Sequence, residues 1–551
     1  MSACFFSKAK KRVIMPFKKG LNLTAWEREL HNDYDKEFLL NGIKSGFDII
    51  DPKASPTSVE LSNHPSARAS NPLYKKATDQ ILEELREGNY VHAPSPPVIV
   101  SPLGVIPKPD GGVRLIHDCS RPAGLAVNDY VSNFHKQKFQ TLDDAKKLVR
   151  QGSYFAKVDL KSAYRSVPIS PYSQQVTGLK WEINHQLCYL YDTKLPFGSK
   201  LAPGIFHRLS QAVRRMMSRR GYTIVVYLDD FLICEDSKDK CHKALVTLIY
   251  LLRELGFYIN WHKVVDPIQR ITFLGIEICS ISMSLRLPED KLLSLREELA
   301  LFLHRKRASK HQLQSLAGKL NWAAAVVYGG RVFLLRIINA FCMLKHKTHK
   351  LRLNADIIQD IQWWHNFIST FNGKSLLLHM QPLTSVFTDA CEAGGGGVYN
   401  SDWFYCNWEL DLPQATSFHI NEKEILAVVI AAHRWAYSWA NHTVYVFSDN
   451  STTVACINKG SSRNALLMHY IRQLFWLSAI YNFRLIAKLI PGKNNVLADA
   501  VSRLHDRDTF VKFFHYHLHN VGKFQLISKS HVSELTSIFL YSRHVLCGQF
   551  G

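Results

Sequence analysis

Three aspartates in the first half of the chain stand where apolar segments end. Asp159 follows one apolar run, and Asp229 and Asp230 separate two apolar runs within 223–235. A charged pair at a hairpin turn can serve solubility alone. Three strand-end carboxylates in one sheet can also hold two divalent cations roughly 3.5–4 Å apart for in-line phosphoryl transfer. Mg²⁺ suits such a site, because it binds through a few carboxylates plus substrate phosphates, and Mn²⁺ is a second candidate.

Four more carboxylates fall in a second segment, about 384–507. Asp389 and Asp449 each end a predicted strand, and Asp499 lies in the first turns of a predicted helix. Helix capping is an alternative role for Asp499 alone, but it does not explain the whole set. Together with Glu424, these residues predict a second site for two Mg²⁺ ions.

Glu424 lies on a predicted helix that begins near Asn421. It shares one stripe of that helix with four apolar residues, Ala427, Val428, Ala431 and Trp435. An unpaired carboxylate on a buried stripe is costly unless it binds a metal. Glu422 lies off this stripe, so we expect it to face solvent or to act as a helix-start charge.

The elements that position these carboxylates form two alternating segments. Helical periodicity begins near Ala77, short β-branched runs alternate with helical patterns from about Gly112 to Ile281, and 289–345 is mostly helical. In 384–507 the order is strands first, then a helix, then a strand and further helices. Gly394 to Gly397 indicate a turn. The pattern predicts an α+β protein.

The composition restricts the partners and the compartment. Lys+Arg number 68 against 46 Asp+Glu, and the net charge of +22 favours a polyanion such as nucleic acid, with a basic solvated surface as the alternative. The 11 Cys include no C-x-x-C pair, which argues against a zinc ribbon or a disulfide framework. The basic start of the chain lacks the apolar stretch of a secretory signal, and the longest uncharged run, 88–107, is too rich in proline for a membrane helix. We expect an intracellular protein of the cytoplasm or nucleus, with no membrane partner.

Six motifs, in this order, resemble those of reverse transcriptases. They are Lys108-Pro-Asp-Gly-Gly-Val-Arg114, Phe155-Ala-Lys-Val-Asp159, Leu195-Pro-Phe-Gly198, Tyr227-Leu-Asp229-Asp230, Asn260-Trp-His-Lys263 and Phe273-Leu-Gly275-Ile-Glu277. The ordered set is far more specific than any single motif. The resemblance implies a right-hand polymerase of fingers, palm and thumb, with Asp159, Asp229 and Asp230 as catalytic metal ligands.

The resemblance also implies which residues bind the substrates. The expected nucleotide-binding residues are Lys108, Arg114, Tyr164, Phe197, Gly198 and Lys263. A solvated hairpin is the alternative for Lys108 and Arg114. Tyr164 would lie beneath the incoming sugar and exclude a 2′-hydroxyl, and its alternative role is a buried aromatic at a helix start. Phe stands at 197 where retroviral enzymes usually carry Gln.

A further set is expected to contact the template and primer. Its members are Tyr227, Leu274, Gly275, Gln314, Gly318 and Trp322. The last three are spaced i, i+4 and i+8, which places them on one helix face. The alternative is a packed stripe in which Gly allows close helix contact. The segment resembles the thumb helix that reverse transcriptases lay in the minor groove, with Lys319 and Arg331 near phosphates.

The second carboxylate set, in the order Asp, Glu, Asp, Asp, resembles ribonuclease H. The resemblance implies an α/β domain with a mixed sheet that uses Asp389, Glu424, Asp449 and Asp499 to bind two Mg²⁺ ions and cut the RNA strand of an RNA–DNA hybrid. Leu489 stands where many members of that family carry a His that assists proton transfer or product release.

The two resemblances divide the chain into six parts. They are an unassigned N-terminal extension, 1–75; fingers and palm, 76–285; a helical thumb, 286–345; a connection, 346–383; a ribonuclease H-like domain, 384–507; and an unassigned tail, 508–551.

Together they imply a retrotransposon RNA- and DNA-directed DNA polymerase with ribonuclease H activity. Its partners would be an RNA template, a DNA primer, an RNA–DNA hybrid and deoxynucleoside triphosphates. Segments 447–458, 491–495 and 498–503 look most like tyrosine-recombinase elements of the DIRS type, with gypsy-type long-terminal-repeat elements second. No protease or integrase signature occurs, so a separate recombinase or integrase is expected. The alternatives are a decayed or domesticated protein that binds nucleic acid without catalysis, and a nuclease-only enzyme.

Overall fold

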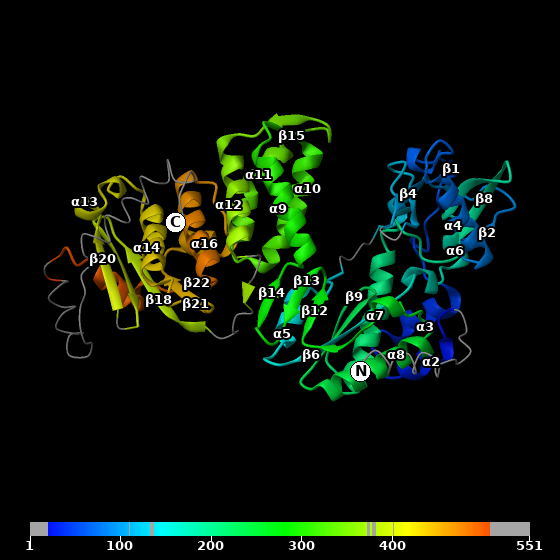
Figure 1. The fold of residues 1–551 in the computed structure, drawn as a ribbon, viewed down its shortest axis with the longest axis horizontal. Helices are drawn as coiled ribbons and strands as arrows, with labels where there is room; N and C mark the ends of the chain where they lie inside the picture. The colour runs from blue at the N-terminus through cyan, green and yellow to red at the C-terminus, as the bar shows by residue number, and fades with distance from the viewer. Residues whose placement is uncertain are drawn as a thin grey trace. The chain divides into compact units, whose positions relative to one another are not determined.

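The computed structural model of the chain describes residues 20–108, 111–132, 137–371, 375–376, 382–400, 402–506 and 508. The chain forms two compact units, Met1–Ile271 and Thr272–Gly551 (Figure 1). Both units mix helices with sheets, as the sequence predicts. No helix in the described part of the chain is long and apolar enough to span a membrane.

The first unit is built around a four-stranded sheet in the order β11-β6-β10-β9. Its strands are β6 (Tyr154–Asp159), β9 (Ile224–Tyr227), β10 (Asp230–Glu235) and β11 (Val265–Ile268). Helix α8 (Lys238–Glu254) packs on β6 and β10, and helix α7 (Ala202–Arg219) packs on β9. The two helices bury apolar side chains against the sheet, which fixes the strand ends that carry the aspartates.

Residues after position 20 complete this core, a role that the sequence did not indicate. Helices α2 (Leu23–Glu29) and α3 (Lys36–Ser45) belong to the same apolar cluster as the sheet. Trp26 is fully buried, and its indole N–H donates to the carbonyl of Leu255 at 3.0 Å. Part of the predicted N-terminal extension, 1–75, therefore belongs to the core of the first unit.

A second sheet of the first unit has five strands in the order β1-β3-β7-β8-β2. They are β1 (Val59–Glu60), β2 (Tyr90–His92), β3 (Ile99–Val100), β7 (Gly178–Ile183) and β8 (Gln186–Asp192). Helix α4 (Tyr74–Arg86) begins near the predicted Ala77, and Tyr74 stacks on Trp181 of β7. A separate hairpin joins β4 (Leu103–Pro107) to β5 (Val113–His117).

The second unit begins with a mostly helical part, and this confirms the prediction for 289–345. Its helices are α9 (Glu289–Leu303), α10 (Lys310–Ala323), α11 (Leu335–Cys342) and α12 (Ala355–Phe371). A small sheet accompanies them in the order β12-β13-β14-β17, comprising β12 (Arg270–Phe273), β13 (Ile276–Cys279), β14 (Ser284–Arg286) and β17 (Ser375–Leu376). A two-stranded pair, β15 (Arg307–Ser309) and β16 (Lys350–Arg352), precedes α10 and α12.

The rest of the second unit contains a mixed five-stranded sheet, as predicted, in the order β20-β19-β18-β21-β22. The strands are β18 (Pro382–Ala390), β19 (Gly394–Tyr399), β20 (Asp402–Asn407), β21 (Thr443–Ser448) and β22 (Arg484–Leu489). Strand β18 is antiparallel to β19 and parallel to β21, and β22 is parallel to β21. The sequence analysis did not identify β22 as a strand.

Four helices accompany this sheet (Figure 1). They are α14 (Ile420–Trp435), α15 (Ser451–Lys459), α16 (Ala465–Tyr481) and α17 (Val496–Ser502). Helix α14 packs on β18 and β19 and against α16, while α17 packs on β18 and β19. These contacts place one carboxylate-bearing helix, α14, directly against two central strands.

The predicted turn at Gly394 to Gly397 is wrong, because all four glycines lie within β19. Tertiary packing explains the composition. A Cβ on Gly396 would lie 2.6 Å from a Val501 methyl of α17, and one on Gly395 would lie 2.4 Å from the Trp408 ring. The turn is formed instead by the residues just before Gly394. Glycine here permits close approach to the strand, which a local turn signal cannot distinguish.

Candidate active sites

The first carboxylate cluster is assembled by two adjacent antiparallel pairs of strands. Asp159 at the end of β6 lies directly opposite Asp230 at the start of β10. Asp229 belongs to the tight turn between β9 and β10, in which Leu228 has a φ of 54°. This left-handed backbone is unfavourable for leucine and stores strain beside the carboxylate. The three predicted aspartates therefore lie together at one end of the central strands of this sheet.

Nitrogen donors partly neutralise this cluster. The Asp159 carboxylate accepts from Asn260 Nδ2 at 2.9 Å and from Lys263 Nζ at 3.2 Å. Lys157 forms an ion pair with Asp230 at 3.0 Å. Burial raises the pKa of Asp229, and the nearby charges of Asp159 and Asp230 raise it further.

The donor chemistry of this cluster fits a divalent metal. All three side chains offer hard carboxylate oxygens, which Mg²⁺ prefers. Asp229 forms no ion pair with any described residue, although two other carboxylates raise its pKa. A bound cation at Asp229 would compensate this repulsion.

Three of the predicted nucleotide-binding residues form one stack. Tyr164 lies parallel to Phe197, with ring centroids 5.1 Å apart and an interplanar angle of 19°. The Arg114 guanidinium lies 5.6 Å from the centroid of the Phe197 ring. Arg114 is exposed and Tyr164 is half-buried. Burial, followed by the charge of Asp229, raises the pKa of Tyr164 to about 12, so its hydroxyl stays protonated at neutral pH.

The other predicted nucleotide-binding residues are Gly198, Lys108 and Lys263. Gly198 has a φ of 129°, and a Cβ there would lie 1.9 Å from the carbonyl oxygen of His117. Lys108 directly follows β4, and its backbone N–H donates to the carbonyl of Gly112 at 2.8 Å. Pro109 and Asp110 of the same motif lie outside the described residues. Lys263 contacts Asp159, as above.

The predicted template–primer residues lie in two units. Tyr227 of β9, in the first unit, has its ring centroid 5.7 Å from that of Phe139. In the second unit, Leu274 and Gly275 form the turn between β12 and β13, with φ values of 49° and 80°. A Cβ on Gly275 would lie 2.9 Å from the indole nitrogen of Trp322, so this tryptophan packs over the turn.

Gln314 and Gly318 are exposed on α10, and Trp322 is half-buried. A Cβ on Gly318 would meet no atom within 4 Å. The alternative in which Gly318 permits close helix packing is therefore wrong for the described part of the chain. Lys319 on the same helix already pairs with Glu298 at 2.6 Å.

The second carboxylate cluster joins two parallel strands and a helix. Asp389 lies at the end of β18, Asp449 directly follows the adjacent β21, and Glu424 projects from α14. One ligand oxygen from each lies within 4.8 Å of the others. Asp389 and Glu424 are buried and Asp449 is exposed, so the cluster opens to solvent on one side.

Hydrogen bonds hold the trio, and the charge of Arg503 acts on Asp389 without a direct ion pair. Glu424 accepts from the backbone N–H of Ala390 at 3.1 Å and from Ser448 Oγ at 3.3 Å. Burial, followed by the charges of Asp389 and Asp449, raises the pKa of Glu424 to about 8. Burial also raises the pKa of Asp389 to about 6, although Ser502 Oγ donates to it at 2.7 Å. No described Lys or Arg forms an ion pair with the trio. These crowded hard oxygens fit a divalent cation.

Asp499 lies near the trio but is bound elsewhere. Its carboxylate pairs with Arg503 at 2.9 Å, and its charge raises the pKa of Asp389. The capping alternative for Asp499 is wrong, because Asn495 is the residue that precedes α17. Leu489, at the end of β22, is exposed.

Some contributors to the two clusters had no predicted role. Asn260, Lys157 and Ser502 lie within or beside the sequence motifs and hold the carboxylates. The spacing of Asn260 and Lys263, and of Asp499 and Ser502, is i to i+3. Residues at this spacing lie on the same side of a helical turn. This is the only sequence signal that could have indicated that both members of each pair act on one carboxylate.

Glu422 behaves as predicted. It is part of a capping box at the start of α14, where its carboxylate accepts from the backbone N–H of His419 at 3.0 Å.

Comparison with known proteins identifies the first of these regions. Residues 106–278 match the family described as reverse transcriptase (RNA-dependent DNA polymerase). The chain contains a reverse transcriptase domain. It is 24% identical over 493 residues to the enzymatic polyprotein of carnation etched ring virus, covering 85% of this chain and 67% of that protein. It is 25% identical over 516 residues to the retrovirus-related Pol polyprotein from transposon opus of Drosophila melanogaster, covering 86% and 48%.

The fold has a counterpart among solved structures. The foamy viral protease-reverse transcriptase in complex with double-stranded DNA aligns with a TM-score of 0.53 and 18% identity, covering 88% of this chain and 85% of that chain. At this identity the likeness shows the fold, an α+β polymerase followed by a sheet domain. The chain spans about half to two thirds of the length of four curated relatives, and less than a third of others.

Proposed function

We propose that the chain is an RNA- and DNA-directed DNA polymerase that also cleaves the RNA strand of an RNA–DNA hybrid. The observation that carries this proposal is the pair of carboxylate clusters on separate sheets, each at the ends of adjacent strands. The family match over 106–278 supports the first activity. The carboxylate trio of the second unit supports the second.

In polymerisation, Asp159, Asp229 and Asp230 would hold two Mg²⁺ ions, which supply activation of the attacking 3′-oxygen and neutralise the leaving pyrophosphate. Lys263 would exchange Asp159 for the substrate phosphates, since both contacts use the same ammonium group. Arg114 and Lys108 would bind the triphosphate, the guanidinium as a planar fork and the ammonium as a point charge.

The stacked ring of Tyr164 would lie beneath the sugar and exclude a 2′-hydroxyl by steric clash. Phe197 supports the Tyr164 ring from one side. Gly198 would keep the segment after Phe197 close to the backbone of His117, because a Cβ there would lie 1.9 Å from the His117 carbonyl oxygen.

In hybrid cleavage, Asp389, Glu424, Asp449 and Asp499 would hold the two ions, and Mn²⁺ is a second candidate for either site. Ser502 and the Ala390 N–H orient Asp389 and Glu424 by hydrogen bonds. To bind metal, the Asp499 carboxylate would break its ion pair with Arg503. The open side at Asp449 would admit the phosphate backbone.

We propose that Tyr227, Leu274 and Gly275 contact the primer and that Gln314, Gly318 and Trp322 follow the duplex. The exposed backbone at Gly318 permits close approach of a sugar edge. Gln314→Ala should shorten extension products more than it slows a single addition, because it weakens retention of the duplex. Lys238→Gln, on the exposed surface of α8, is a control of similar exposure. Equal product lengths in wild type and Gln314→Ala would contradict the role.

We also propose that the chain comes from a DIRS-type retrotransposon, with a gypsy-type element as the second candidate. This proposal rests on segments 447–458, 491–495 and 498–503. A separate recombinase or integrase would then insert the DNA copy.

Primer extension on an RNA template with deoxynucleotides and Mg²⁺ tests the first activity, and a hybrid with labelled RNA tests the second. Extension together with RNA cutting supports the proposal. Binding without either reaction would favour a decayed or domesticated protein. RNA cutting without extension would favour a nuclease-only enzyme.

A further inference from the structure

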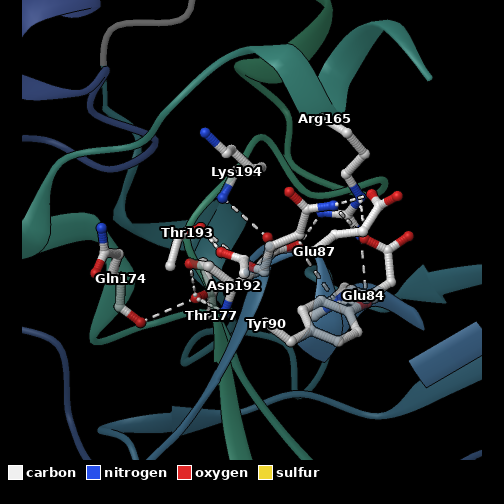
Figure 2. A network of polar contacts seen from close by, with 12 residues as sticks. Glu84, Glu87, Tyr90, Arg165, Gln174, Thr177, Asp192, Thr193 and Lys194 are labelled. Carbon is white, nitrogen blue, oxygen red and sulfur yellow. Dashed lines mark hydrogen bonds and ion pairs between the residues drawn. The ribbon is translucent and has the colours of Figure 1, made fainter. Parts of the chain in front are cut away.

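A buried polar network is centred on Arg165 and Asp192 (Figure 2). Arg165, the residue after Tyr164, donates to Asp192 at 2.6 Å and pairs with Glu84 at 3.2 Å. Its guanidinium also donates to the hydroxyl of Tyr90 at 3.3 Å. The Asp192 side chain is 0% exposed and that of Arg165 is 10% exposed. The network is therefore a buried charge group joined to the first ring of the Tyr164–Phe197 pair.

The same network reaches the second ring through the backbone. Asp192 ends β8, and its carboxylate accepts from the N–H of Lys194 at 2.9 Å. Lys194 begins the segment that leads to Phe197. Within that segment, the Phe197 carbonyl accepts from the backbone N–H of His117 at 3.0 Å. Asp192 and His117 thus hold the segment of Phe197 at two points.

The His117 side chain closes the network. Its Nε2 lies 3.2 Å from the Tyr90 hydroxyl and 3.8 Å from the Asp192 carboxylate. Burial, followed by the positive charge of Arg165, lowers the pKa of His117 to about 3, so the ring is neutral. Arg165 therefore forms the ion pair with Asp192, on which the charge of Lys194 also acts, and the planar fork of Arg165 fixes the geometry of Asp192 and Glu84.

Burial of the Arg165–Asp192 ion pair removes both charges from water, which costs free energy. A gain in folding stability does not by itself account for the pair. A buried ion pair often stabilises a protein no better than apolar residues of similar volume. Its planar, charge-assisted hydrogen bonds instead define one arrangement of the groups that carry it. The groups held here are the backbone of Tyr164 and the segment that leads to Phe197.

We propose that Arg165 and Asp192 are positioning residues that fix the Tyr164–Phe197 ring pair, and thereby set nucleotide affinity and selection against ribonucleotides. This inference rests on the proposed polymerase function. Neither residue contacts substrate in it. Their effect passes through Tyr164, the adjacent residue, and through the segment that ends at Phe197.

The first test compares Arg165→Lys with wild type in single-nucleotide primer extension. Lysine keeps the charge but loses the fork, so KM for the deoxynucleotide should rise about tenfold through misplacement of the rings. The turnover number should change less, and the ratio of ribonucleotide to deoxynucleotide incorporation should rise. Template–primer affinity should stay at the wild-type value. Unchanged KM and ratio in folded Arg165→Lys would overturn the proposal.

A matched pair in the same unit controls for loss of a buried ion pair. Arg215 and Asp33 lie 2.7 Å apart, with side chains that are 16% and 1% exposed. Arg215→Lys should lower the melting temperature as Arg165→Lys does, without changing KM or the ratio. An equal change in KM and ratio in both variants would assign the effect to general destabilisation and overturn the proposal.

Two further variants test the inference in other ways, and the first does so even if Arg165→Lys does not fold. If Arg165→Lys does not fold, the double change Arg165→Met with Asp192→Leu removes both charges at similar volume and should still alter the ratio. In a Tyr164→Ala background, Arg165→Lys should add no further change in the ratio, because the ring it positions is gone. Additive effects would contradict positioning through Tyr164. A wild type without primer extension would overturn the polymerase proposal and this inference together.

Discussion

The two carboxylate clusters differ in how their charges are balanced by the protein. In the first cluster Lys263 contacts Asp159 and Lys157 contacts Asp230. In the second, Glu424 and Asp389 are buried without an ion pair to any described basic residue, and burial raises the pKa of both. The first cluster is partly neutralised, whereas the second keeps its repulsion.

From this difference we predict how each cluster would bind its metal ions. The ligand oxygens of the second trio already lie within 4.8 Å of one another, so little movement is needed. In the first cluster, Lys263 occupies an oxygen of Asp159, so we infer that the incoming triphosphate draws this ammonium away. Metal binding at the first site would then depend on nucleotide, and at the second it would not.

The largest expected effect separates the two clusters by activity. Asp229→Asn should reduce DNA synthesis by about a thousandfold, because loss of a metal ligand removes several kcal/mol of transition-state stabilisation. Hybrid cleavage should stay near the wild-type rate. Both rates are measured on the same preparation. Equal loss of both activities in a folded variant would contradict two separate sites.

The converse substitution acts on the second cluster. Asp449→Asn should leave primer extension unchanged and reduce cutting of RNA in a hybrid by a similar factor of about a thousand. Glu424→Gln should do the same, since a neutral amide cannot replace a carboxylate ligand. The matched control is Glu422→Gln, which should be close to silent because glutamine also supports a capping box. An essential Glu422 and a dispensable Glu424 would reverse the assignment.

A smaller effect is expected at Tyr164, beside the first cluster. Tyr164→Ala should raise the ratio of ribonucleotide to deoxynucleotide incorporation on the order of tenfold to a hundredfold, by removing the ring that excludes a 2′-hydroxyl. Tyr164→Phe keeps the ring and serves as the control. The ratio is measured from incorporation efficiencies. A wild-type ratio in an active Tyr164→Ala protein would reduce Tyr164 to a packing residue.

The sequence was sufficient where the signal is local. The strand that ends at Asp159, the turn at Asp229, the strand end near Asp389 and the buried stripe of Glu424 follow from periodicity and residue type over a few positions. The α+β class follows in the same way. Fold likeness to a foamy viral enzyme agrees with this class.

Features that depend on distant contacts could not be predicted. Trp26 donates to Leu255, 229 positions away, and no local pattern indicates that contact. The glycines of β19 resemble a turn locally, but their reason is the close packing of Val501 and Trp408. The bond from Arg165 to Asp192 spans 27 positions and two elements. Tertiary packing decided each of these cases.

The smallest expected effect concerns stability, and it compares the two clusters without any substrate. Burial raises the pKa of Glu424 from 4.5 to about 8. Between these values the folded state retains a proton that the unfolded state has lost. The stability from Glu424 is therefore full below pH 4.5 and is lost as pH rises through 8. With a chelator present, the melting temperature should fall across this window.

Mg²⁺ or Mn²⁺ should reverse this fall, because metal binds the deprotonated carboxylates of the folded state only. Each kcal/mol regained should raise the melting temperature by roughly 2–4 °C, so the ion should help more at pH 8 than at pH 5.5. Glu424→Gln should remove most of the metal response and the part of the pH slope between about 6 and 8, because Asp389, whose pKa is raised to about 6, contributes only below that range. Asp229→Asn should keep both, since the first cluster is expected to need nucleotide. Calorimetry with and without the ion measures these shifts, and an undiminished metal response in Glu424→Gln would show that the preformed trio is not the metal site.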